Sequence, residues 1–262
     1  MAFTFISGAT GGIGKAFAVS CAKKGYNLFV TGRSDEKLSA LKTELLKING
    51  NIDVRYFPCD LFDDKDRDKM LSVIRENGIA FDRLINVAGV DIQKAFRAYT
   101  SEKLLFQLRV NAEATITLTY GLLPLFENKG EIITISSMSG VSPMPYFAVY
   151  SATKALLTNF FTALHYELKK DGIKVTTVLP GGVPTRPDVI QAIKEQKLWG
   201  KISAKSPEFV AEKSLKAVKK NKIKYIPGAF NKILYFLMKI APKRIVLSVI
   251  AKRWKNISKD AF

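Results

Sequence analysis

The stretch FTFISGATGGIG, residues 3–14, decides the fold. Its first five residues predict a short buried strand, and residues 13–25 predict a helix that Gly25 ends. Between them Gly8, Gly12 and Gly14 have the spacing G-x-x-x-G-x-G, which differs from the commoner G-x-G-x-x-G fingerprint. Glycines at this place let the backbone approach a pyrophosphate at a helix N-terminus. A glycine turn without a ligand is the alternative, but the strand and helix on either side favour dinucleotide binding.

Outward from this stretch, short β-branched or aromatic runs alternate with amphipathic segments. Further strands are expected at 27–32, 53–60, 82–89, 130–137, 173–181 and, as a possible last strand, 222–228. Helices are expected at 34–48 and 63–76, and Ser206-Pro207 has the form of a helix start. This alternation predicts βαβ units in a doubly wound, mainly parallel α/β domain of the Rossmann type over residues 1–228. Residues 229–262 are expected to form a basic amphipathic C-terminal helical extension.

Composition narrows the functional classes. The 262 residues suffice for one large domain, and no signal peptide or apolar run of roughly 20 residues is expected to direct or span a membrane. Cys21 and Cys59 are expected to be reduced, as in a cytoplasmic protein, and no metal site is expected. The single histidine, His165, disfavours a Ser-His-Asp hydrolase and is expected to be a partly exposed helical residue.

The positive charge is concentrated at the C-terminus. Residues 213–262 hold 14 Lys and Arg against one acid, Asp260, which gives +13 of the net +18. Two apolar stripes at helical spacing, separated by Pro242, run through this region; they comprise Phe230, Ile233, Leu234, Leu237 and Met238, then Ile245, Val246, Val249, Ile250 and Trp254. A helix pair that covers an active-site mouth or a subunit contact is favoured. Peripheral contact with the inner membrane surface is the second option, and nucleic-acid binding is disfavoured.

Arg33 stands just after the second expected strand, where a dinucleotide's adenosine ribose is bound in such folds. A guanidinium suits a 2′-phosphate by charge and by paired hydrogen bonds, so this position favours NADPH over NADH. Asp35 and Glu36 follow, and they are expected to open the next helix rather than bind the ribose. A solvated loop charge is the alternative for Arg33.

The stretch YSATK, residues 150–154, places Tyr150 four residues before Lys154 in an expected helix. Side chains at this spacing lie one above the other on a helix face. The spacing alone is also compatible with simple packing.

Seven motifs taken in order resemble the short-chain dehydrogenase/reductase family in its compact single-domain form, including 3-oxoacyl reductases and hydroxysteroid dehydrogenases. They are SGATGGIG (7–14), CDL (59–61), NVAG (86–89), Asn111, ISS (135–137), YSATK and PGGVPT (180–185). The resemblance covers roughly residues 1–228. It implies catalytic roles for Asn111, Ser137, Tyr150 and Lys154.

The resemblance also implies a set of cofactor contacts. The glycine loop contributes Gly8, Thr10, Gly12, Ile13 and Gly14, the adenine contacts are Asp60 and Leu61, the loop lining the cofactor contributes Asn86, Ala88 and Gly89, and the nicotinamide end contacts Pro180, Gly181, Val183 and Thr185. Lys154 is implied to bond the nicotinamide ribose and Asn111 to relay protons through water. Three positions depart from the family pattern: Ser7 replaces threonine, Val87 replaces an asparagine, and Gly11 stands where NADPH users often have a basic residue.

The expected reaction is hydride transfer between NADPH and a ketone or secondary alcohol, which the protein assists by position and field. Tyr150 would exchange the proton, Lys154 would lower its pKa from about 10, and Ser137 would orient the carbonyl. Ser136, Ser139 and Ser142 are assigned to loop structure, and Tyr146 to a pocket wall. The alternatives are a non-catalytic dinucleotide-binding or membrane-surface protein on the same fold and, more weakly, a sugar epimerase or dehydratase of the family's longer form.

Residues 186–205 are expected to form a substrate lid. Its apolar members are Val189, Ile190, Ile193, Leu198 and Trp199, which face either a hydrophobic substrate or the fold itself. The expected substrate is a small hydrophobic carbonyl or alcohol compound, acyl or steroid-like. The expected assembly is a homodimer built on the helices that hold Asn111 and Tyr150.

Overall fold

A single parallel sheet organises the protein, which is seen here in a computed structural model that describes residues 2–255, without the side chains of 128, 192 and 197. The seven strands follow the order β3-β2-β1-β4-β5-β6-β7. Their bounds are β1 Phe3–Ser7, β2 Asn27–Gly32, β3 Val54–Pro58, β4 Phe81–Asn86, β5 Phe126–Ile135, β6 Lys174–Val178 and β7 Lys224–Tyr225. The predicted doubly wound fold is therefore confirmed, and the last expected strand is only two residues long.

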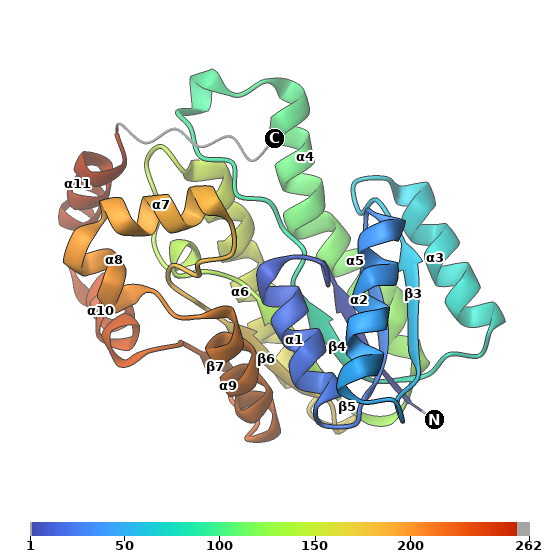
Figure 1. Cartoon of the computed structure of the whole chain (residues 1–262). Helices are drawn as coiled ribbons and strands as arrows, with labels where there is room; N and C mark the ends of the chain where they lie inside the picture. The colour runs from blue at the N-terminus through green and yellow to red at the C-terminus, as the bar shows by residue number, and fades with distance from the viewer. Residues whose placement is uncertain (1, 256–262) are drawn as a thin grey trace.

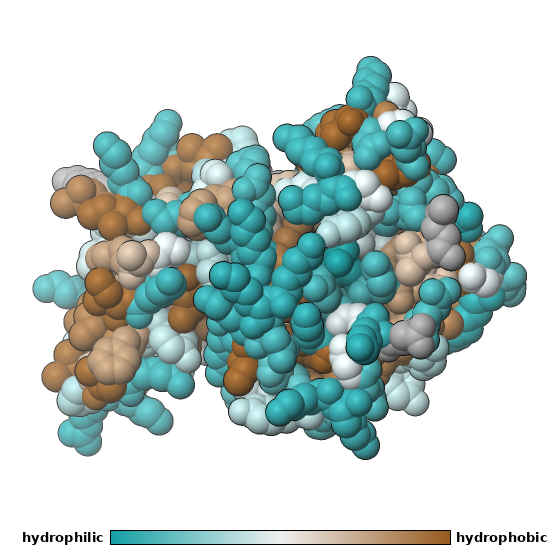
Figure 2. Space-filling view, turned by 90° about the horizontal axis from the view of Figure 1, so that it is seen from below, coloured by the Kyte–Doolittle hydropathy of each residue, from teal (hydrophilic) through white to brown (hydrophobic). Residues whose placement is uncertain are grey.

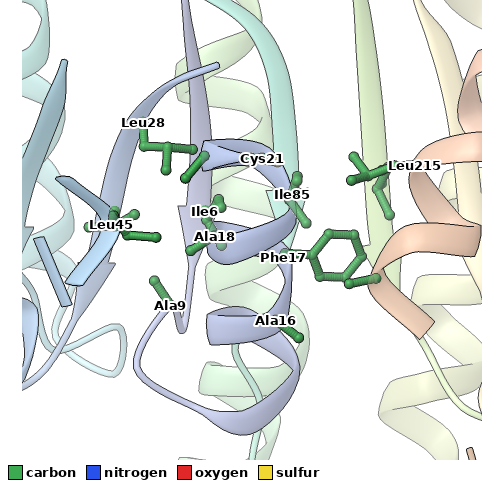
Figure 3. Packing of buried hydrophobic residues seen from close by; sticks show 14 of the residues in the cluster. Ile6, Ala9, Ala16, Phe17, Ala18, Cys21, Leu28, Leu45, Ile85 and Leu215 are labelled. Atoms are coloured by element: carbon green, nitrogen blue, oxygen red, sulfur yellow. The ribbon is translucent and has the colours of Figure 1, made fainter. Parts of the chain in front are cut away.

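Helices cover both faces of the sheet (Figure 1). One face carries α1 (Gly12–Ala22), α2 (Asp35–Ile48) and α9 (Pro207–Lys219), and the other carries α3 (Asp64–Glu76), α5 (Ala114–Leu122) and α6 (Ala148–Glu167). Figure 3 shows the first layer at close range, where Phe17 of α1 points toward Leu215 of α9. Both side chains are at most 1% exposed, so this packing fixes α1, and the glycine turn before it, against the sheet.

The remaining short elements connect this framework. They are α4 (Ser101–Leu108), the 3-10 turns η1 (Phe96–Ala98), η3 (Leu123–Leu125) and η4 (Met138–Gly140), and the π-helical turn η2 (Arg109–Glu113). Ser34 and Ser206 cap α2 and α9 by accepting hydrogen bonds from Lys37 N and Phe209 N. Asp35 and Glu36 lie in the first turn of α2, as expected from their preference for a helix N-terminus.

A row of buried polar residues crosses the sheet at the carboxyl ends of its strands. Ser7 is in register with Thr31 on one side and Asn86 on the other, and the row continues through Thr134 to Thr177. All five are at most 3% exposed. Because all strands are parallel, the loops that follow them meet at this edge, which is where ligands bind in such sheets.

The C-terminal part adds helices beside the β7 end of the sheet, at the left of Figure 1. The expected lid forms α7 (Pro187–Glu195) and α8 (Lys197–Ser203). The expected extension forms α10 (Ala229–Ile240) and α11 (Lys243–Trp254), and Pro242 separates the two as predicted. Its last residues, 256–262, lie outside the described part of the chain. Between residues 2 and 255, no helix has the length and apolar character needed to cross a membrane.

One expectation about the helices is wrong. His165 was expected to be partly exposed, but it is only 7% exposed in the last turn of α6. Its Nδ1 lies 2.8 Å from the carbonyl oxygen of Val175 on β6. The helix end turns this face toward the sheet, and the backbone carbonyl satisfies the polar ring.

Candidate active site

Tyr150 and Lys154 occupy the first turns of α6 and project together. The Lys154 ammonium lies 5.7 Å from the centre of the Tyr150 ring. On its other side the Tyr150 ring stacks on Phe147, with centroids 4.5 Å apart and planes within 9° of parallel. The phenol is therefore held in place by an aromatic neighbour and has a cation within reach.

Lys154 is 4% exposed, and its Nζ donates a hydrogen bond of 2.9 Å to the carbonyl oxygen of Ile135, at the end of β5. Burial lowers the pKa of this ammonium to about 8, an effect that the Asp91 carboxylate opposes. The lysine is thus tied to the carboxyl edge of the sheet and poised close to neutral pH.

The pKa of Tyr150 is raised above its ordinary value, mainly by burial and secondly by Asp91. A hydrogen bond with Ser137 and the charge of Arg186 act in the opposite direction. The expected lowering by Lys154 is therefore not what this structure shows. The physical reason is that removal from water penalises the phenolate more than the neighbouring groups stabilise it, while burial also disfavours the lysine's own charge.

Asn111 reaches the same place from the π-helical turn η2, which interrupts α4 and α5. Its Oδ1 accepts a hydrogen bond of 2.6 Å from Val90 N, and its Nδ2 donates one of 2.9 Å to Val90 O. Gly89 is the residue that lets these groups come close, since a Cβ there would lie 3.2 Å from Asn111 Oδ1 and 3.4 Å from Lys154 Nζ. Single π-turns often mark functional positions, and here the turn places Asn111 beside the lysine.

Ser137 follows β5 and is 9% exposed, and its Oγ accepts a hydrogen bond of 3.0 Å from Ser139 N. The neighbouring serines bond within the protein. Ser136 donates to Lys154 O at 2.7 Å, and Ser139 O and Ser142 O both accept from Ser151 Oγ. Of these serines, the one that interacts with the Tyr150 phenol is Ser137.

The glycine turn is built so closely that side chains would not fit. Gly8 has φ +65°, and a Cβ there would lie 2.8 Å from Ala88 Cα. A Cβ on Gly14 would lie 2.1 Å from Gly8 O, and one on Gly12 would lie 2.7 Å from Thr185 Cγ2. The bare backbone at the start of α1 therefore lies close against Thr185, and a helix N-terminus without side chains is the kind of site that fits a pyrophosphate group.

Ser7 and Asn86, at the ends of the neighbouring strands β1 and β4, form hydrogen bonds beside this turn. Ser7 Oγ accepts hydrogen bonds from Val87 N at 3.1 Å and Ala88 N at 3.3 Å, so serine performs the task of the more usual hydroxyl. Asn86 Nδ2 donates to Thr119 Oγ1 at 3.0 Å, whereas no described residue bonds to its buried Oδ1. Val87 packs against the apolar core, and its backbone holds the loop without the amide that the family pattern has.

The region expected to bind the adenosine end has one exposed cation and one short turn. Arg33 follows β2 directly, is exposed, and makes no ion pair with any described residue. Thr10 Oγ1 lies close to the end of the same strand, 3.1 Å from where a Cβ on Gly32 would be. Asp60 Oδ1 accepts a hydrogen bond of 3.0 Å from Phe62 N, which shapes the turn that contains the 7%-exposed Leu61. The first helical turn after Ile13 completes this side.

The segment expected at the nicotinamide end runs from β6 to the lid. Pro180 O accepts a hydrogen bond of 2.9 Å from Met138 N, so this segment is bonded to the turn after Ser137. A Cβ on Gly181 would lie 3.0 Å from the Asn231 side chain of α10, and Val183 is buried. The C-terminal extension therefore packs directly beside the expected cofactor segment.

Sequence reasoning missed two charged residues at the phenol, Asp91 and Arg186, which both shift the pKa of Tyr150. Each lies close to a motif, since Asp91 lies two residues after Gly89 and Arg186 directly follows Thr185. Their positions next to these motifs could have indicated a role in the site. The sequence does not show which way their side chains point. Arg186 also pairs with Asp188 at 3.0 Å, at the start of α7.

The extension also contributes to the site, through contacts between residues far apart in sequence. Trp254 of α11 stacks on Phe147, with ring centroids 6.1 Å apart, so an aromatic series runs from the extension through Phe147 to Tyr150. Arg253 donates a hydrogen bond of 2.8 Å to Gln196 Oε1 and lies 5.1 Å above the Trp199 ring. Residues of α11 thus contact both Gln196, in the expected lid, and Phe147, which stacks on Tyr150.

Comparison with known proteins gives the same fold and family. A 7β-hydroxysteroid dehydrogenase structure superposes with a TM-score of 0.87 at 23% identity and covers 95% of this chain and 96% of its own. A short-chain dehydrogenase from Sphingobium yanoikuyae in complex with NADPH superposes at 0.80, with 24% identity, over 99% and 97% of the two chains. These two likenesses show the fold.

Sequence relatives extend the comparison. A very-long-chain 3-oxoacyl-CoA reductase from Kluyveromyces lactis is 34% identical over 189 residues, which are 68% of this chain and 54% of that protein. The chain thus spans about half the length of this relative. Residues 2–196 match the family of short chain dehydrogenases. With this match over most of its length, the chain belongs to the short-chain dehydrogenase family.

Proposed function

We propose that this protein is an NADPH-dependent reductase of hydrophobic ketones, with Tyr150 as the proton donor. The observation that carries the proposal is the convergence of Tyr150, Lys154, Ser137 and Asn111 beside a glycine cradle, at the carboxyl edge of one sheet. These side chains come from three separate segments, and simple packing does not require this combination of a phenol, an ammonium, a hydroxyl and an amide.

A nicotinamide cofactor supplies the hydride that reduces a carbonyl carbon, or accepts it in the reverse direction. The protein's residues handle the oxygen. Ser137 donates a hydrogen bond that orients the carbonyl, and Tyr150 gives its phenolic proton to the oxygen as negative charge develops there. The carbonyl thus gains one hydride and one proton and becomes an alcohol. Lys154 stabilises the phenolate left behind, and Asn111 positions the Gly89–Val90 backbone next to the lysine, where a water can return the proton.

The raised pKa of Tyr150 suits a proton donor, since the phenol stays protonated across the neutral range until charge develops on the substrate. Asp91 favours this state, whereas Arg186 and Ser137 favour the phenolate that follows. These groups therefore act on both protonation states that the proposed proton transfer needs.

The preference for NADPH rests on Arg33. It is an exposed guanidinium without an ion-pair partner among the described residues, directly after β2, and the Sphingobium yanoikuyae structure of the same fold holds NADPH. Asp35 and Glu36 are engaged in the first turn of α2, which leaves no acid in the place that suits a free ribose hydroxyl.

We expect Arg33→Ala to weaken NADPH binding by roughly 10- to 100-fold, the worth of a charge-assisted hydrogen bond, and to leave NADH binding unchanged. Fluorescence titration with both nucleotides measures this. Arg55→Ala is the matched control, since Arg55 is an exposed arginine on the neighbouring strand β3 that pairs with Asp53. Equal losses for NADPH and NADH, or tighter binding of NADH by the wild type, would contradict the assignment.

The proposed substrate is a ketone with an apolar body, of an acyl or steroid-like kind. The Phe147 ring stacks on Tyr150 and also contacts Trp254, and Trp199 of the expected lid packs on Phe230 with centroids 4.9 Å apart. The names of the 3-oxoacyl-CoA reductase and the 7β-hydroxysteroid dehydrogenase are consistent with this class. The experiment that tests the proposal is NADPH oxidation by the purified protein with a panel of 3-oxoacyl thioesters, steroid ketones and short polar ketones. Turnover confined to the polar ketones would sink the substrate assignment.

Trp254→Ala is expected to raise the KM for an apolar ketone by roughly 3- to 10-fold, because it removes an aromatic contact worth about 0.5–1.5 kcal/mol. The dissociation constant for NADPH should not change. Steady-state kinetics and nucleotide titration measure the two quantities. Val249→Ala is the control, since this residue lies on the exposed side of the same helix. An unchanged KM would show that Trp254 does not border the substrate.

We also propose a homodimer built on the outer sides of α4–α5 and α6. Tyr120 of α5 is 81% exposed, and Tyr166 and Leu156 of α6 are 66% and 45% exposed. Large apolar side chains gathered on neighbouring helices favour burial by a second copy of the chain.

A further inference from the structure

The two helices of the extension leave one apolar face uncovered, which we call the outer face. It comprises Ile233, Phe236, Leu237 and Ile240 of α10 with Ile245 and Val249 of α11, which are 50–62% exposed. The α10 residues follow the spacing i, i+3, i+4, i+7 and so form one stripe. Figure 2 shows hydrophobic residues gathered at this end of the molecule, where Figure 1 places α10.

Both helices of the extension are anchored to the domain by other residues, so the outer face is the side that they leave exposed. Asn231 of α10 is 1% exposed and donates hydrogen bonds to Ser203 O at 2.9 Å and Pro227 O at 2.7 Å. The far end of α11 is held by Arg253 on Gln196 and by Trp254 on Phe147. These contacts fix which side of the pair remains for a partner.

The charge around the outer face has one sign. From Ala229 to Lys255 the chain has seven Lys or Arg and no Asp or Glu. Lys232, Lys243 and Arg244 lie exposed in the first turns of α10 and α11, where the helix dipole favours acids. Cations at these positions weaken both helices, so helix stability does not account for them, whereas an anionic partner does.

We propose that the outer face docks onto an anionic lipid surface. Apolar side chains rimmed by cations match lipid acyl chains beneath negatively charged headgroups. Each helix has 12 residues and spans about 18 Å, so the pair lies in the interface and does not cross the roughly 30 Å hydrocarbon layer. A second copy of the chain would bring two surfaces of the same charge together, which disfavours it as the occupant.

The outer face continues onto the lid, where α8 presents the exposed Leu198 and Ile202. Trp199 joins α8 to α10 through Phe230. The expected lid therefore lies at the same side of the molecule as the outer face. This inference goes beyond the proposed reaction and does not depend on it.

Vesicle flotation with the purified protein tests the proposal, using phosphatidylcholine vesicles with and without phosphatidylglycerol at low and high salt. We expect binding to the mixed vesicles that salt weakens, and little binding to phosphatidylcholine alone. The triple variant Lys232→Glu, Lys243→Glu, Arg244→Glu should weaken binding by at least roughly 100-fold. Because acids in these first turns favour both helices, a loss cannot be assigned to unfolding.

Two further variants complete the design. Phe236→Ser with Ile240→Ser should reduce binding by removing apolar surface, without changing the charge. Lys23→Glu with Lys47→Glu and Lys69→Glu is the matched control, since it changes the net charge equally at exposed positions near or on α1, α2 and α3. This control should bind as the wild type does. NADPH titration of every variant separates a failure of docking from a failure of the proposed reaction.

Three results would overturn the proposal. The first is that the wild type does not bind the mixed vesicles. The second is that the control triple variant loses as much vesicle binding as the triple variant of the outer face. The third is that light scattering finds a smaller oligomer for the Phe236→Ser, Ile240→Ser variant than for the wild type. The second would show that net charge alone drives binding, and the third would show that the outer face is a subunit contact.

Discussion

Tyr150→Phe is expected to lower kcat for ketone reduction by roughly 100- to 10,000-fold, the usual contribution of a general acid. The substitution removes only the hydroxyl, so the ring still stacks on Phe147 and the fold around it is kept. Binding of NADPH should therefore stay close to that of the wild type. Stopped-flow or steady-state oxidation of NADPH with an apolar ketone measures the change.

The matched control is Tyr146→Phe. Tyr146 lies four residues earlier with φ +63°, and it has no lysine at the fourth position after it. Its hydroxyl is the nearest rival proton donor in sequence, and its removal should leave kcat within a few-fold. If instead Tyr146→Phe abolished the reaction and Tyr150→Phe did not, the assignment of the proton donor would be wrong.

Lys154→Met is expected to lower kcat by roughly 100- to 1,000-fold, because it removes a positive charge that stabilises the developing phenolate. It is also expected to alter how stability depends on pH. Burial lowers the pKa of Lys154 to about 8 from 10.5, so between these values the unfolded chain binds the proton and the folded chain releases it. The wild type should therefore gain up to about 3 kcal/mol of stability relative to the variant as pH rises from 8 to 10.5.

Denaturant unfolding at several pH values measures this difference, with activity recorded in parallel. Cys21 and Cys59 are present in both proteins and cancel in the comparison. Tyr150 stays protonated in both folded proteins over this range, because burial raises its pKa. Lys169→Met, at an exposed lysine after α6, is the matched control. A constant difference between wild type and Lys154→Met across this range would contradict a buried, neutralisable lysine.

Much of the framework was predictable because local sequence determines it. The strands and their glycine turn follow from runs of apolar residues and from Gly8, and parallel strands necessarily bring their following loops to one edge. Ser137, which follows β5, and the segment 180–185, which follows β6, reach that edge for this reason.

The parts that sequence reasoning missed depend on contacts between distant residues or on side-chain direction. The π-helical turn around Asn111 is a local irregularity that the spacing of hydrophobic residues does not predict. The contacts of Trp254 with Phe147 and of Arg253 with Gln196 join segments whose relative position only the fold decides. The direction of the Tyr150 pKa shift was missed because it depends on how fully the phenol is buried.

The extension was expected to cover the active-site mouth or a subunit contact, or to contact a membrane, and its helices have one side that packs on the domain and one that stays exposed. On the inner side, Asn231 bonds to Ser203 of α8 and Trp254 packs on Phe147. The outer side stays exposed and is rimmed by cations. The sequence alone does not separate these two sides of α10, because apolar residues cover most of the circumference of this helix.

The most direct test of the central claim is the transfer of deuterium from NADPH labelled at the reactive carbon of its nicotinamide to a 3-oxoacyl thioester or steroid ketone. We predict that mass spectrometry finds the alcohol product carrying a single deuterium at the former carbonyl carbon with the wild type, and almost none with Tyr150→Phe. If the wild type binds NADPH but transfers no deuterium to any ketone of the panel, the protein is a dinucleotide-binding protein without this catalysis, and the account of Tyr150 as proton donor fails.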